Sequence, residues 1–404
     1  MPRNFRPFTS ILIVLLAIVV IGGLVWANTL YARTQETEKQ FLVPWLGART
    51  FLQYGVSPYD DQASVRAQLI YYGHQADETE DPMRSYTPFP VELFYFPFAL
   101  VTDYALARGL WMTLGELALA ATVILCLSIT EWKPSRFLLP ILLLFIIFWN
   151  YSFQALLHGS AAPVAVFGFL GSLAALKSKR DELAGTLLTL TFLQPSITML
   201  ALFFALWWMI ASKRWRILIG FSMVAGFFTF VAFLLIPGWF MPFLRGLVTH
   251  YRIDPGITVA RLLTEWWPAA GSKFALVLTL ILVLVLILEW RSMRQGDFRH
   301  QLWTACLVMS VAPLIGIPTS LDGHILLFLP LILLFSISSE RWRSNRTAII
   351  IGAVLVVLYF LLWAISSSAH ALFLVLPILM LGGLYWMRWW AVHPPRTWVD
   401  AIRK

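Results

Sequence analysis

The stretch YTPFPVELFYFPFALVTDYALARGLW, residues 86–111, decides how this chain is threaded through a membrane. It is long, aromatic and mostly apolar, but prolines interrupt its first half. If residues 88–102 formed a full span, every later loop would change sides and the basic loops would lie outside, against the usual charge bias. We therefore expect a short juxtamembrane or re-entrant helix over 88–102 on the outer side, followed by a span at 105–130. Two true spans are the alternative.

The composition around this stretch is that of an integral membrane protein. Of the 404 residues, 59% are hydrophobic and 13% are charged, whereas soluble domains carry roughly 25% charged residues. We expect an all-α polytopic protein with about 10–13 transmembrane helices. The apolar runs that predict spans lie near 8–27, 105–130, 137–153, 160–176, 217–236, 272–289, 301–317, 323–339, 347–366 and 370–388.

The basic residues gather in alternate loops, which predicts the orientation of the chain. The net charge of +9 therefore indicates membrane topology, and no nucleic-acid partner is expected. Both termini are predicted to be cytoplasmic. The loops predicted to face the cytoplasm carry Lys133/Arg136, Lys177/Lys179/Arg180, Lys213/Arg214/Arg216, Arg291/Arg294/Arg299, Arg341/Arg343/Arg346 and the tail from Arg388 to Lys404.

Two segments stand out within what we expect to be a single transmembrane domain over 1–404. Residues 28–104 form a large first external loop that is rich in carboxylates and contains amphipathic or re-entrant helices. Residues 181–212 are mostly apolar but are flanked by the basic residues Arg180 and Lys213, and Gln194–Pro195 lies in the middle. Each half is too short to cross the membrane, since about 15 residues of helix reach only about 22 Å. A helical hairpin that enters from the cytoplasm and turns at Gln194–Pro195 would leave the basic residues at both of its ends on the cytoplasmic side.

The turn QYGVSPYDDQ, residues 53–62, offers two carboxylates beside an aromatic hydroxyl. Asp60 could simply cap the helix that follows, with Asp61 favourable in its first turn. Either carboxylate could instead act as a general base at the membrane surface, with Tyr59 contacting a substrate.

Further polar groups are expected at the outer ends of the spans. Asn150, Gln154 and His158 recur at a spacing of four, which predicts one polar face of a helix. That face either bonds to a neighbouring helix or lines a headgroup cavity. A phosphate-bearing lipid needs external cations, and the candidates are Arg84, His250, Arg252 and His324, along with Arg49, Arg66 and Arg261. Glu116 lies inside a span, but a transporter usually shows several such groups.

The order of these pieces resembles the membrane glycosyltransferases of the GT-C superfamily, most closely glycosyltransferase family 87. The matching pieces are FLVPWLGARTFLQYGVSPYD, the stretch 86–111, QALLHGS, DELAG, TFLQPSITML and SKRWR.

The resemblance implies a GT-C-like helix bundle on the cytoplasmic (inner) membrane of a bacterium. It implies transfer of a sugar from a polyprenyl phosphate donor to a glycan or glycolipid acceptor on the outer face. It further implies an inverting mechanism in which a carboxylate of the first external loop is the base. No nucleotide sugar, cofactor or metal is expected.

The chain departs from the family pattern at three places. The family's loop Asp is Gln40 here, its hairpin Lys is Gln194, and its outer turn reads HGSAAP. A glutamine can contact substrate but cannot accept the proton, and loss of a general base costs roughly 10²–10⁴-fold in rate. Asp60, Asp61 or Glu38 is therefore expected to replace the base. The alternatives are a catalytically inactive relative that binds lipid-linked glycan or a partner, and a lipid or solute transporter.

Overall fold

A computed structural model describes residues 7–35, 37–253, 256–293, 297–316, 319–342 and 345–392. These residues form helices joined by turns, and their single β-bridge joins Ile257 to Thr319. The prediction of an all-α polytopic protein is therefore confirmed. The chain divides into two compact units, which are described separately below. Unit 1 comprises Met1–Ala118, Ala155–Ala161 and Ala225–Asp254, and unit 2 comprises Leu119–Gln154, Ala162–Val224 and Pro255–Lys404.

Seven helices of the described residues are long and apolar enough to cross a membrane. The bent pair α7 (Leu138–Phe148) and α8 (Asn150–Leu157), which meet at 51°, makes an eighth if it counts as one span. Two further expected spans are shorter helices, α9 (Ala162–Lys177) and α16 (Phe298–Val311). A helix of 16 residues is only about 24 Å long, so fewer helices than expected reach across a bilayer core of about 30 Å. The seven long spans are Val14–Thr34, Tyr104–Thr130, Trp215–Leu235, Gly271–Met293, Leu321–Arg341, Arg346–Ala364 and Ala369–Trp389.

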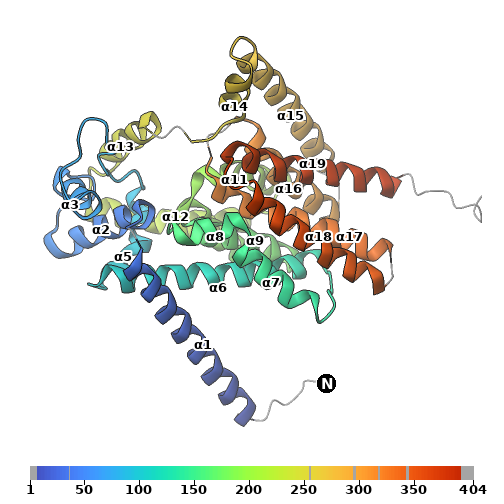
Figure 1. Ribbon diagram of the computed structural model, residues 1–404, viewed down its shortest axis with the longest axis horizontal. Helices are drawn as coiled ribbons and strands as arrows, with labels where there is room; N and C mark the ends of the chain where they lie inside the picture. Colours follow the sequence, from blue (N-terminus) through green and yellow to red (C-terminus); the bar gives the residue numbers. More distant parts are fainter. Residues whose placement is uncertain are drawn as a thin grey trace, which may run out of the picture. The chain divides into compact units, whose positions relative to one another are not determined.

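Unit 1 is built on the first of these spans and on the start of the second. Its helices are α1 (Pro7–Thr34), α2 (Lys39–Tyr54), α3 (Asp61–Tyr71), α4 (Phe89–Glu92), η1 (Leu93–Tyr95), α5 (Phe96–Ala99), the start of α6 (Tyr104–Thr130), the end of α12 (Trp215–Leu235) and α13 (Phe240–Ile253). In Figure 1 the apolar helix α1 extends away from α2, α3 and α5, which lie together. Residues 37–103, here called the loop segment, connect α1 to α6.

Polar contacts fasten α1 to α6 inside the apolar region of unit 1. Asn28 donates through Nδ2 to Thr113 Oγ1 and to Glu116 Oε2, both at 3.1 Å. A Cβ on Gly109 would lie 2.4 Å from Thr29 Oγ1, so the two helices touch at this glycine. Glu116, the intramembrane carboxylate noted in the sequence, thus has an amide partner on α1.

Residues 88–102, on which the threading depends, contain only short helices. Pro88 precedes α4, and Pro90 and Pro97 lie in the first turns of α4 and α5. Proline ends a helix that would otherwise continue through it, because it lacks the N–H and clashes with the preceding turn. The eleven helical residues from Phe89 to Ala99 would extend only about 16 Å even if straight. A full span is therefore excluded for this stretch.

Unit 2 contains a break in the helical chain around Gln194–Pro195, where the sequence predicts the turn of a helical hairpin, and the hairpin itself stays a prediction. Its helices are α7, α8, α9, α10 (Asp181–Leu188), η2 (Thr189–Leu193), α11 (Pro195–Ala211), α14 (Val259–Trp266), α15 (Gly271–Met293), α16, η3 (Ala312–Leu314), η4 (Leu321–Leu327), α17 (Phe328–Arg341), α18 (Asn345–Ala364) and α19 (Ala369–Val392), with the end of α6 and the start of α12. The break between η2 and α11 falls at Gln194, and Pro195 is the first residue of α11. That this hairpin enters from the cytoplasmic side stays a prediction.

Different kinds of contact hold the helices of unit 2 together. A Cβ on Gly185 would lie 2.0 Å from the carbonyl oxygen of Ile217, so α10 and α12 meet backbone to backbone. Arg214 binds both carboxylate oxygens of Asp181 across the ends of the expected hairpin. Helix α17 contacts α16, α18 and α19, and α16 also contacts α19, so these four helices form one packed group (Figure 1).

Candidate functional site

The start of α2 carries two of the residues that the sequence singled out, Glu38 and Gln40. Glu38 is the N-cap residue of α2, with an extended backbone, and its side chain makes no capping hydrogen bond. Both side chains are half-buried. The Tyr104 hydroxyl donates to the Glu38 carbonyl oxygen at 3.4 Å.

The turn that carries His158 packs directly against this end of α2. Gly159 has φ = 71°, and a Cβ there would lie 2.7 Å from Phe41 Cβ. Trp111 donates through Nε1 to the Gly159 carbonyl oxygen at 2.9 Å, and its ring stacks on Phe41 with centroids 5.6 Å apart. Arg108, almost fully buried, donates to the Leu157 carbonyl oxygen at 2.7 Å. The structure therefore brings the turn of His158 to the residues that follow Glu38 and Gln40.

The prediction that Asn150, Gln154 and His158 form one polar face of a single helix is wrong. Helix α8 begins at Asn150 and ends at Leu157, so His158 lies in the following turn. Trp149 is extended and separates α8 from α7, while the positive φ of Gly159 ends the helix in the manner of a glycine C-cap. Asn150 is buried and its Nδ2 atom has no hydrogen-bond partner, and Gln154 is half-buried.

The turn with Asp60 and Asp61 is held by interactions of both carboxylates. Asp60 is the N-cap residue of α3, and its side chain accepts a hydrogen bond from the Gln62 N–H at 2.9 Å. Asp61 pairs with Arg84 at 2.7 Å, and both side chains are exposed. The structural interpretation of Asp60 as a helix cap is therefore confirmed. A catalytic role for either residue stays a prediction.

Tyr59 and His250 both contact the short stretch that follows Arg84. The Tyr59 hydroxyl donates to the Thr87 carbonyl oxygen at 2.6 Å, and burial raises the pKa of this hydroxyl. The His250 ring, on α13, stacks on Tyr86 with centroids 3.7 Å apart. Arg252 is exposed on the last turn of α13. Three predicted substrate contacts, Tyr59, Arg84 and His250, therefore share one part of unit 1.

Glu92 is the residue of this region that the sequence interpretation missed. It is fully buried on α4, and Ser85 donates to its Oε1 atom at 3.1 Å. Oε2 has no hydrogen-bond partner among the residues that the structure describes, and burial raises the pKa of the carboxyl well above its usual range. The available signal was a single carboxylate within the apolar run PFPVELFYFPF. A carboxyl held this way stays neutral, because an isolated buried charge is very costly.

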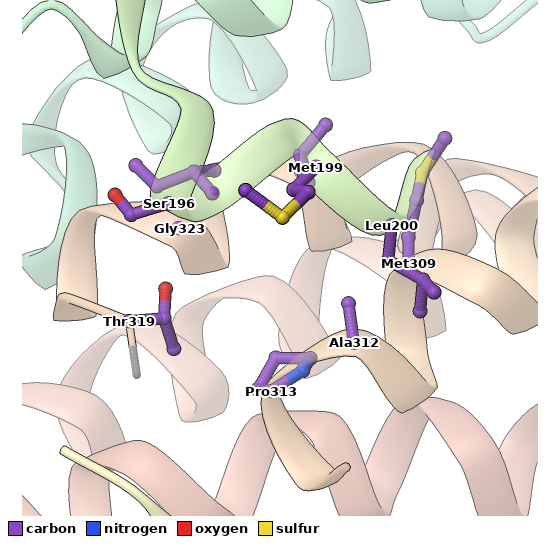
Figure 2. A pocket seen from close by; sticks show the side chains of 10 residues that line it. Ser196, Met199, Leu200, Met309, Ala312, Pro313, Thr319 and Gly323 are labelled. Atoms are coloured by element: carbon purple, nitrogen blue, oxygen red, sulfur yellow. The ribbon is translucent and has the colours of Figure 1, made fainter. Parts of the chain in front are cut away.

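The remaining predicted residues lie in unit 2. Gln194 is half-buried at the break between η2 and α11, where its carbonyl oxygen accepts a hydrogen bond from Thr198 Oγ1 at 3.0 Å. Close by, Figure 2 shows a small pocket in which Ser196 and Thr319 place hydroxyl groups beside Met199, Met309 and Gly323. Its lining is mainly apolar and includes no carboxylate.

His324 is packed inside unit 2. Its ring is fully buried and stacks on Tyr151, with centroids 4.8 Å apart. Nε2 lies 2.8 Å from the Phe373 carbonyl oxygen and Nδ1 lies 3.1 Å from that of Leu321. Since both ring nitrogens face main-chain carbonyls, His324 joins η4 to α19.

The protein-family model for glycosyltransferase family 87 matches residues 85–315, more than half of the chain. The chain belongs to glycosyltransferase family 87. This confirms the resemblance drawn from the sequence and identifies the protein as a membrane glycosyltransferase of that family. No curated protein and no solved structure matches the chain.

The family 87 match covers one part of the candidate site and not the other. It begins at Ser85, so Glu92, Arg108, His158, Gln194 and the stretch around Tyr86 lie within it. Glu38, Gln40, Tyr59, Asp60 and Asp61 precede it, and His324 follows it. The carboxylates predicted as the base therefore lie in the part of the chain that the family model does not describe.

Proposed function

We propose that this family 87 protein transfers a sugar from a polyprenyl phosphate donor to a glycan or glycolipid acceptor. The reaction takes place on the outer face of a bacterial cytoplasmic membrane and inverts the anomeric centre. The observation that carries the proposal is the family match, and the seven apolar helices support a donor that is itself anchored in a membrane. Both chain ends are cytoplasmic in this arrangement, because the basic loops require it.

Glu38 is the base in this mechanism. Asp60 caps α3, and Asp61 pairs with Arg84 and in this proposal orients that guanidinium for the donor phosphate, whereas the side chain of Glu38 makes no capping hydrogen bond within the described residues. The Glu38 carboxylate takes the proton from an acceptor hydroxyl as its oxygen bonds to the anomeric carbon. The bond from that carbon to the phosphate oxygen breaks on the opposite face. Gln40, in the first turn of α2, hydrogen-bonds the sugar or the acceptor.

Arg84, His250 and Arg252 supply positive charge for the leaving polyprenyl phosphate. Charge-assisted hydrogen bonds to phosphate are about twice as strong as neutral ones, and they stabilise charge that grows as the leaving group departs. Arg84 and the His250 ring are both linked to one short stretch, because Arg84 lies two residues before Tyr86, on which the His250 ring stacks. Gln194 carries no charge, so in this proposal the positive charge comes from these three residues of unit 1.

The test is a donor assay with the full chain in proteoliposomes. A radiolabelled sugar is offered either on polyprenyl phosphate or on a nucleotide, together with a glycolipid acceptor. We expect label to move only from the polyprenyl phosphate, with inversion at the anomeric carbon. Transfer from the nucleotide sugar alone would contradict the donor class. No transfer, combined with tight binding of the donor, would show an inactive relative.

The sidedness of the site is tested separately by labelling engineered thiols in sealed cells. The native residues Cys126 and Cys306 are buried, so they give little background. Asp77→Cys in the loop segment should react with an impermeant maleimide from outside, while Lys133→Cys should react only after the membrane is opened. The reverse pattern would place the active site on the cytoplasmic face.

A further inference from the structure

The buried carboxyl of Glu92 lies where three separate segments of unit 1 meet. A Cβ on Gly47 would lie 2.7 Å from Glu92 Oε1 and 3.0 Å from Pro58 Cβ. The carboxyl therefore rests on α2 and beside the turn that leads into α3. One turn earlier on α4, Phe89 packs in an apolar cluster with Ala232 and Trp239. This cluster closes the surroundings of the carboxyl to solvent.

A chain of hydrogen bonds connects Glu92 to the segment of Arg84. Ser85 Oγ donates to Glu92 Oε1 at 3.1 Å and accepts from the Thr87 N–H at 3.4 Å. The Thr87 carbonyl oxygen in turn accepts from the Tyr59 hydroxyl at 2.6 Å. On its other side the segment touches α13, because a Cβ on Gly246 would lie 2.4 Å from the Ser85 carbonyl oxygen. Ser85 is thus fixed between Glu92 and α13, with Arg84 and Tyr86 on either side of it.

We infer that Glu92 is a positioning residue that holds segment 84–87 in the geometry in which Arg84 and His250 bind the donor phosphate. The inference rests on the proposed function for the role of these two cations. Glu92 itself touches neither substrate nor solvent, since its side chain is fully buried. It acts through Ser85, and through the contact between Tyr86 and His250.

The role of Glu92 requires the neutral form of its carboxyl. Burial raises its pKa, and the Ser85 hydrogen bond opposes the rise only in part. The ionisable groups facing it are the Tyr59 and Tyr95 hydroxyls, which are themselves buried and have raised pKa values. Arg84 is directed to Asp61 instead. Because the folded state binds this proton more tightly than the unfolded chain does, stability falls as the pH rises through the raised pKa.

The experiment compares Glu92→Gln with Glu92→Ala in the full chain in proteoliposomes. The glutamine keeps a neutral acceptor for Ser85, so we expect kcat and the donor KM to stay within about 2-fold of the parent values. Because glutamine does not ionise, the rate of transfer should also fall less steeply at alkaline pH. The alanine removes the anchor and should raise the donor KM about 3- to 10-fold with a smaller change in kcat. Glu78→Gln, an exposed carboxylate of the same loop segment, is the matched control and should change nothing.

A second readout does not depend on activity. The protection factors of the amides of residues 84–87, which are corrected for the intrinsic rise of exchange with pH, should fall in Glu92→Ala. They should also fall in the parent protein at alkaline pH, but not in Glu92→Gln. If Glu92→Ala does not fold, Ser85→Ala replaces it and should raise exchange at the same amides. Parent-like exchange in whichever of these variants folds would overturn the inference. If Arg84→Gln leaves the donor KM unchanged while exchange behaves as expected, only the phosphate role in the proposed function fails.

Discussion

Polar side chains in the loop segment of unit 1 and around His324 in unit 2 have different kinds of partner. In the loop segment they pair with one another near the surface, as Asp61 does with Arg84 and Lys39 with Asp81. Around His324 they are buried and contact main-chain carbonyls, as the Tyr151 hydroxyl does at 2.6 Å from the Leu372 carbonyl oxygen. Exposed ion pairs contribute about 0–1 kcal/mol to stability, whereas leaving a buried polar group unpaired costs about 1–3 kcal/mol.

This difference separates the two regions experimentally. A change in the loop segment can alter the reaction without unfolding the protein, because little of the stability depends on its surface pairs. A change near His324 removes packing and should act first on stability. Glu92 belongs to a smaller set of loop-segment residues whose side chains are as buried as those of the unit 2 group; the others are Thr50, Ser64, Gln68 and Ser85.

The largest effect is expected at Glu38. Glu38→Gln keeps the size of the side chain but cannot accept a proton, so transfer should fall about 10²- to 10⁴-fold. The melting temperature should stay unchanged, because this carboxylate makes no capping hydrogen bond. The measurement is the initial rate of sugar transfer in proteoliposomes, with Glu78→Gln as control. Full activity in Glu38→Gln, with loss in Asp60→Asn or Asp61→Asn, would move the base to the turn before α3.

A smaller effect is expected at His324, and it concerns the stability of the fold and not the rate of transfer. His324→Ala should lower the free energy of unfolding by about 2–4 kcal/mol, since it opens a cavity beside Tyr151 and leaves the Phe373 carbonyl oxygen without its partner. Thermal unfolding in detergent micelles measures this. His74→Ala changes an exposed histidine of the loop segment and serves as the control. Equal melting temperatures for the two variants would remove the contrast between the regions.

The sequence supported some of these conclusions and concealed others. Hydropathy located seven of the ten expected spans, and Pro195 and the three prolines between 88 and 97 marked the breaks, because proline acts locally. The cap at Asp60 also follows from local spacing. By contrast, the burial of Glu92 depends on Gly47 and Ser85, which local periodicity cannot bring together.

The end of α8 shows how a local signal can be overlooked. The spacing of Asn150, Gln154 and His158 favoured a continuous helix, but Gly159 follows directly and allows the left-handed conformation that ends it. The role of His324 was hidden for another reason. A histidine after Asp-Gly resembles an exposed turn, and only the packing of Tyr151 and Phe373 shows that it is buried.

The smallest effect is expected at Asp60, where a cap and a base can be told apart. Asp60→Ala removes the acceptor for the Gln62 N–H and should cost about 1 kcal/mol of stability, with transfer unchanged. Asp60→Asn keeps an acceptor at the N-cap and should retain both stability and activity. Because asparagine caps a helix but cannot take a proton, loss of transfer in Asp60→Asn at an unchanged melting temperature would show that Asp60 performs the chemistry assigned to Glu38.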